Sequence, residues 1–83
     1  MTAPDAELDC VGLYCPMPVA MTRERIGLLE PGQLLLVTAD DPAAEEDIQR
    51  WARRTGNEVL EFKRDGNILT FMIRKGAKDD RKE

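Results

Sequence analysis

The sequence predicts an α+β domain, a two-layer sandwich with the element order βαβαββ. Two segments carry apolar residues at helical spacing, and four short segments have the composition of strands. An Asp65-Gly66 pair predicts a tight hairpin between the last two strands. Right-handed crossovers then place both helices on one face of a mixed four-stranded sheet, and the last strand can insert between the second and third.

The chain of 83 residues is expected to form a single domain, because a second core would have too little chain. We expect a core at about 6–75 and a charged, solvated and mobile tail at 76–83. Hydrophobic residues at 42% and charged residues at 34% are typical of a soluble globular domain. The N-terminus has no signal-peptide pattern and no apolar run approaches the ~18 residues of a membrane helix, so we expect a cytoplasmic protein without a membrane partner.

The first strand is expected at Ala6–Cys10, and Gly12 permits the turn that follows it. The first helix is expected to begin at Pro16 or Pro18, because proline is tolerated in the first helical turn. It should extend to about Glu30, before Pro31-Gly32. Its apolar face consists of Val19, Thr22, Ile26 and Leu29.

The second strand, Gln33–Ala39, is apolar without alternation, which suits a central strand. Asp40-Asp41-Pro42 predicts the start of the second helix, with Asp41 as N-cap and proline in the first position. One face of that helix carries Ala44, Ile48, Trp51, Ala52 and Thr55, and Gly56 is expected to end it.

The last two strands are expected at Glu58–Arg64 and Asn67–Arg74. Alternation places Leu60 and Phe62 on one face of the third strand. In the fourth strand the shared face consists of Leu69, Phe71 and Ile73.

Charge and composition exclude several function classes. The formal net charge of −4 argues against direct nucleic-acid binding. Histidine is absent, which excludes a Cys-His pair, a Ser-His-Asp triad and a His-ligated zinc. Two cysteines are too few for an all-thiolate zinc site, so we expect neither a metal nor a bound cofactor.

The candidate functional residue is Cys15, which directly precedes Pro16-Met17-Pro18. Its sulfur should lie near a helix N-terminus, where free N–H groups favour an anion. The stabilisation of an anion at a helix N-terminus is about 0.3–1 kcal/mol, which predicts a modestly lowered thiol pKa. Met17 adjoins the thiol and Arg23 lies two turns further along the helix. Both belong to residue types enriched at interfaces, so we expect them to contact a partner.

Several motifs together resemble the TusA/SirA family of sulfur carriers over about Glu7 to Lys75. They are Leu8-Asp9, Gly12-Leu13, Cys15-Pro16-Met17-Pro18, Arg23, Pro31-Gly32, Ala39-Asp40-Asp41-Pro42-Ala43, Asp47-Ile48 and Ile73-Arg74-Lys75. Cys-Pro-x-Pro alone would be weak evidence, but in this context it is specific. The resemblance independently implies the same βαβαββ sandwich.

The resemblance implies that Cys15 accepts a sulfane sulfur as a persulfide from a cysteine desulfurase or a rhodanese-type donor. It also implies relay to an acceptor protein, for tRNA thiolation, molybdenum-cofactor supply or sulfur oxidation. The chain would then be a carrier rather than a stand-alone turnover enzyme, with covalent sulfur as its only cargo. Arg23, Asp40 and Asp41 match further family positions, and with the Pro-x-Pro element they are candidates for motif support and partner docking.

Two other function classes remain open from the residues. Cys15 could merely pack, in a regulatory or interaction module that carries nothing. Alternatively, Cys10 and Cys15 could form a small dithiol redox protein, although their spacing is wider than Cys-x-x-Cys. For Cys10 we expect a small buried residue at a strand end.

Overall fold

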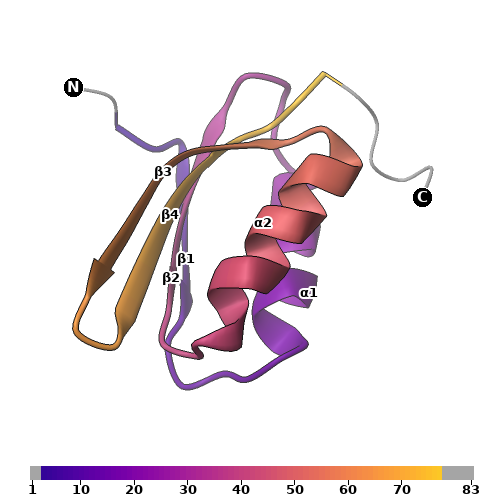
Figure 1. Cartoon of the computed structure of the whole chain (residues 1–83). Coiled ribbons are helices and arrows are strands. Elements are labelled where there is room, and N and C mark those ends of the chain that lie inside the picture. Colours follow the sequence, from indigo (N-terminus) through magenta and orange to yellow (C-terminus); the bar gives the residue numbers. More distant parts are fainter. Residues whose placement is uncertain (1–2, 78–83) are drawn as a thin grey trace.

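The computed structural model describes residues 3–77 and has the predicted order of elements (Figure 1). The elements are β1 (Ala6–Cys10), α1 (Met17–Ile26), β2 (Leu34–Ala39), α2 (Ala43–Thr55), β3 (Glu58–Asp65) and β4 (Ile68–Arg74). The strands form one sheet in the order β1-β2-β4-β3. β1 runs parallel to β2, and β4 runs antiparallel to both β2 and β3. The insertion of the last strand between the second and third is thereby confirmed.

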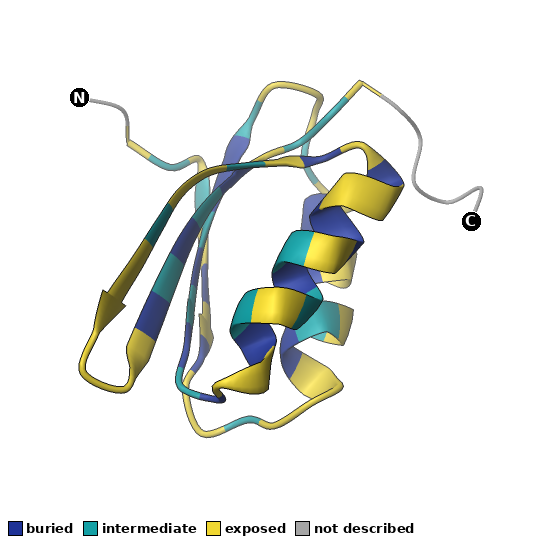
Figure 2. Cartoon of the chain, in the orientation of Figure 1, coloured by how far each residue is buried: buried dark blue, intermediate teal, exposed yellow. Residues whose placement is uncertain are grey.

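Both helices cover one face of the sheet, and the core lies between the two layers (Figures 1 and 2). The central strands supply the sheet side of this core, with Val37 of β2 paired to Phe71 of β4. The helix side comes mainly from α2, whose buried residues match the predicted face: Ala44, Ile48, Trp51, Ala52 and Thr55. Gly56 ends α2 at φ +81°, the left-handed conformation expected of it.

The first helix is shorter than predicted. It ends at Ile26, and the backbone continues in tight turns, with Leu28 N–H donating to Arg25 O at 3.1 Å and Leu29 N–H to Ile26 O at 3.0 Å. Glycine at position 27 is a poor helix former, and Pro31 disfavours a helical conformation at Glu30. Of the predicted apolar face, Thr22 and Ile26 are buried, whereas Val19 and Leu29 are half-buried.

The third strand departs from strict alternation. A bulge between Val59 and Glu61 leaves Leu60 as the extra residue, so Leu60 is 45% exposed. Val59 and Phe62 pack against the core instead, which corrects the prediction that Leu60 and Phe62 share a face. The hairpin is also displaced by one residue: Asp65 pairs with Ile68, so the loop is Gly66-Asn67 rather than Asp65-Gly66.

The chain after β4 stays attached to the domain for at least two residues. Lys75 N–H donates to Gln33 O at 2.9 Å, and Gly76 N–H donates to Asn57 Oδ1 at 2.9 Å. Gly76 lies so close to Gly56 that an added Cβ would stand 1.9 Å from the Gly56 carbonyl oxygen. Of the tail expected to be mobile, residues 78–83 lie outside the described part of the chain.

Two glycine-to-alanine substitutions should therefore have opposite effects on stability. Gly76→Ala should lower the free energy of unfolding by more than about 1 kcal/mol, because backbone must move to admit the methyl group. Gly27→Ala should raise it by about 0.4–1 kcal/mol, because Gly27 is right-handed with ordinary Cβ space. Urea denaturation measures both, and equal behaviour of the two variants would show that the Gly76–Gly56 contact is absent in solution.

Candidate functional site around Cys15

Cys15 lies in the connection between β1 and α1 and is exposed. Met17 N–H donates to Tyr14 O at 2.8 Å, which closes a turn around Cys15 and Pro16, and the Cys15–Pro16 peptide bond is cis. Ala20 N–H donates to Pro16 O at 3.1 Å, the first bond of α1. The helix thus begins at Met17, between the two starts left open by the sequence.

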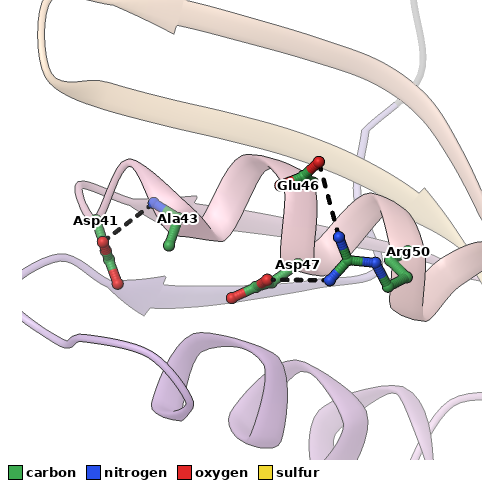
Figure 3. A network of polar contacts seen from close by, with 5 residues as sticks. All are labelled: Asp41, Ala43, Glu46, Asp47 and Arg50. Carbon is green, nitrogen blue, oxygen red and sulfur yellow. Dashed lines mark hydrogen bonds and ion pairs between the residues drawn. The ribbon is translucent and has the colours of Figure 1, made fainter.

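The Asp40-Asp41 pair fastens this turn to the start of α2. One carboxylate oxygen of Asp41 accepts from the Cys15 backbone N–H at 2.7 Å. The other oxygen accepts from Ala43 N–H at 3.1 Å, so the Asp41 side chain caps the start of α2 (Figure 3). The helix begins at Ala43, however, and Pro42 occupies the cap position rather than the predicted first helical position. Asp40 accepts from Gly12 N–H at 2.9 Å. Each aspartate therefore connects the loop before α1 to the loop before α2, a contact across more than twenty residues of sequence.

The structure separates the residues of the Pro-x-Pro element. Pro18 is buried and anchors the first turn of α1, whereas Pro16 is exposed beside the thiol. Met17 is 45% exposed and Arg23 is exposed, so both are accessible to a partner. Their docking role remains a prediction.

Cys15 opens onto a cleft of about 250 Å³ between the two helices. On the α1 side its wall is uncharged, formed by Pro16 and Val19. The α2 side supplies all the charged groups, and its lining residues are Asp47, Arg50, Trp51 and Arg54. An exposed thiol at such a cleft is accessible to a small group that enters from a partner protein.

Asp47 is the residue of this cleft whose role the sequence did not reveal. The Asp47 carboxylate raises the pKa of the Cys15 thiol, chiefly because hydrogen bonding to this carboxylate favours the protonated sulfur. Desolvation of the sulfur and the negative charges of Asp47 and Asp41 raise the pKa of Cys15 further. The lowered pKa predicted from the helix N-terminus is therefore wrong in direction, because two carboxylates of α2 and its leading loop outweigh a modest dipole term.

Arg50 balances part of this negative charge. Its guanidinium lies 3.6 Å from the Asp47 carboxylate and 3.7 Å from that of Glu46, as Figure 3 shows. Figure 3 also shows Asp47 on the side of α2 that faces α1, whereas Glu46 lies on the outer side. Asp47 therefore pairs with the guanidinium and lines the same cleft as the thiol.

Cys10 has a different environment. It is free and fully buried at the end of β1, as expected for a small core residue. Burial raises the pKa of the Cys10 thiol, which makes it a poor nucleophile. This burial argues against the dithiol alternative, because Cys10 is shielded from partners and oxidants.

Exposed apolar side chains flank the thiol on both sides in sequence. Tyr14 is 71% exposed, Val11 44% and Met17 45%. Among these only Met17 was expected at a partner contact. Tyr14 and Val11 were not predicted, because apolar and polar residues alternate irregularly in this turn. An aromatic residue directly before the cysteine is nevertheless typical of an interface.

Within residues 3–77, no group of three or more His, Cys, Asp or Glu side chains is placed to hold a metal ion. No helix in that part of the chain is long and apolar enough to cross a membrane.

Comparison with known proteins gives consistent matches. The sequence model of the family described as "Sulfurtransferase TusA" matches residues 6–75. YrkI of Bacillus subtilis is 43% identical over 72 residues, which cover 87% of this chain and 96% of that protein. The "Sulfur carrier protein TusA" of Allochromatium vinosum is 39% identical over 71 residues, covering 86% and 93% of the two chains. Among solved structures, a SirA-like protein from Desulfitobacterium hafniense superposes with a TM-score of 0.74 at 25% identity, covering 86% of this chain and 97% of that one.

The two aspartates that hold the cysteine loop should differ in their contribution to stability. Asp41→Ala removes a helix cap worth about 0.5–2 kcal/mol and leaves the Cys15 N–H without its acceptor. Asp40→Ala removes one exposed bond, worth about 0.5–1.5 kcal/mol. Urea denaturation should therefore place Asp41→Ala below Asp40→Ala. Equal stabilities would show that the Asp41 bonds do not hold the loop.

Proposed function

The chain belongs to the family of the sulfurtransferase TusA, and we propose on that basis that it is a sulfur carrier whose working group is the thiol of Cys15. The observation that carries the proposal is the exposed thiol on a loop fixed by Asp41, at the mouth of a cleft between the helices. A carrier needs an accessible sulfur in a defined position, and Cys10 is buried.

The proposed reaction is an exchange of sulfur without net oxidation. Cys15 loses its proton, and its sulfur attacks the terminal sulfur of a persulfide on the donor protein. The donor S–S bond breaks, and its electron pair stays on the donor cysteine sulfur, which takes up a proton. A new S–S bond on Cys15 then holds the transferred sulfur as a persulfide, and no cofactor is required. Attack by an acceptor thiol on that terminal sulfur repeats the step in the onward direction.

A cysteine desulfurase or a rhodanese-type protein is the proposed donor, and a second protein is the proposed acceptor. The relay would serve tRNA thiolation, molybdenum-cofactor supply or sulfur oxidation. Support for protein partners comes from the exposed apolar side chains beside Cys15, because aromatic residues and methionine are enriched in interface cores. Arg23 and Met17 are part of this proposed docking surface, and Asp40 and Asp41 support it by holding the loop.

Loading should depend on Cys15 alone. After incubation with a cysteine desulfurase and cysteine, the intact mass of the parent chain should increase by one sulfur atom. Cys15→Ser should show no increase at unchanged circular dichroism, since the substituted side chain is exposed. Cys10→Ala should still load. Loading of Cys15→Ser, or its loss in a folded Cys10→Ala variant, would contradict the assignment.

Truncation of Tyr14 should separate docking from chemistry. Tyr14→Ala should slow sulfur transfer from a partner protein at least fivefold, the effect of losing about 1 kcal/mol of interface contact. Transfer from a small persulfide donor should not change, because the thiol is untouched. The matched control is Leu28→Ala, since Leu28 is 76% exposed but lies just beyond the far end of α1. Equal slowing by both truncations would argue against a docking surface at the thiol.

A further inference from the structure

The charged groups of the cleft beside Cys15 are unevenly placed along α2. Arg50 and Arg54 follow Asp47 on this helix, about 4.5 and about 10.5 Å further along its axis. Figure 3 shows the first of these steps, from the Asp47 carboxylate to the Arg50 guanidinium. The loop before α2 adds a second carboxylate, Asp41, which binds the Cys15 backbone. The cleft is therefore acidic at the cysteine and basic toward the C-terminal end of α2.

The basic end of the cleft stands out on an acidic protein. The chain has a formal net charge of −4, but the residues that line the cleft include two arginines and a single carboxylate. The Arg50 side chain is 59% exposed, and its ion pairs with Glu46 and Asp47 are 3.7 and 3.6 Å long. Because exposed pairs of this kind are weak, Arg50 can exchange them for a carboxylate of another protein at little cost.

The remaining walls of the cleft are apolar. They are formed by Pro16 and Val19 beside α1 and by Trp51 of α2. The indole N–H of Trp51 is buried and has no hydrogen-bond acceptor within residues 3–77, so an oxygen of an occupant that reaches it would supply one. The cleft volume of about 250 Å³ is below the roughly 300–1,000 Å³ of ordinary small-molecule sites. This size favours the side chains of a protein segment over a free ligand.

We propose that this cleft docks an acidic segment of the protein that exchanges sulfur with Cys15, with the partner's carboxylates paired to Arg50 and Arg54. The inference rests on the proposed carrier function and adds to it the chemistry of the partner. An apolar side chain of the same segment packs against Trp51. The charges also set the direction of docking, because a partner carboxylate beside Asp47 would meet like charge. The partner's acidic residues therefore lie toward the C-terminal end of α2, and its reactive sulfur lies over the cysteine.

A short acidic peptide tests the docking site directly, because Trp51 is the only tryptophan of the chain and lines the cleft. The probe is a pentapeptide with blocked ends, in which a central leucine stands between two pairs of glutamates. Titration of the parent chain should change the indole fluorescence saturably. Added sodium chloride should weaken the binding, because the charge pairs are exposed to solvent. The same peptide with lysine in place of glutamate should not bind, and inorganic sulfate at equal ionic strength should not reproduce the change.

Two neighbouring arginines of α2 provide a matched pair of variants. Arg54→Glu should weaken binding of the acidic peptide about tenfold or more, because it removes one charge pair and adds repulsion. Arg53→Glu makes the same change of charge at the same end of the helix, but Arg53 lines a separate hollow with Glu45 and Glu46. This control should bind nearly as the parent does. Arg50→Gln should also weaken binding, which protects the test against misfolding of Arg54→Glu.

Several outcomes would overturn the inference. They are equal binding by Arg54→Glu and Arg53→Glu, unchanged binding by Arg50→Gln, binding of the lysine peptide, an equal response to sulfate, and the absence of a saturable response in the parent. Loading of the parent by a cysteine desulfurase and cysteine is measured in parallel. Failure of the parent to load contradicts the carrier function, whereas the peptide titrations judge the docking site independently.

Discussion

The bond between the Asp41 carboxylate and the Cys15 backbone N–H is the interaction on which the placement of the thiol depends. Asp41 is 9% exposed, and its second oxygen caps α2 through Ala43. One buried side chain thus ties the start of the second helix to the loop before the first. The buried face of α2 packs on the sheet and fixes the helix in place. The position of the cysteine loop therefore depends on the packing of the core.

The electrostatics of the site follow from the same arrangement. Carboxylates hold the loop, and carboxylates near a thiol raise its pKa. The groups that fix the position of Cys15 therefore also disfavour its thiolate form. An enzyme that depends on a permanently activated cysteine would need a cation or a base in contact with the sulfur. In a carrier the activating group can come from the partner, so a raised thiol pKa in the free chain is compatible with the proposed carrier role.

Local sequence patterns were sufficient to predict the order of the helices and strands and the buried face of α2, because each depends on residues only a few positions apart. They failed where a single residue interrupted the regular spacing of apolar residues. At Gly27 the helix α1 ends earlier than predicted, and the bulge at Leu60 changes which side chains of β3 face the core. The choice of Cys15 as the working residue stays a prediction, whereas the bond of the Asp41 side chain at the start of α2 was correctly expected from the sequence. The Asp41–Cys15 bond and the place of Asp47 in the cleft beside Cys15 were not predictable, because both bring together segments more than twenty residues apart in sequence and depend on how the two helices lie against each other.

The central claim is that sulfur is carried on Cys15 and nowhere else in the chain. The most direct test is peptide mass spectrometry of the unmodified protein after incubation with a cysteine desulfurase and cysteine, with free thiols and persulfides alkylated before digestion. The account predicts one additional sulfur atom, located on the peptide that contains Cys15, with the Cys10 peptide unchanged. Additional sulfur on the Cys10 peptide, or none on either peptide, would contradict it.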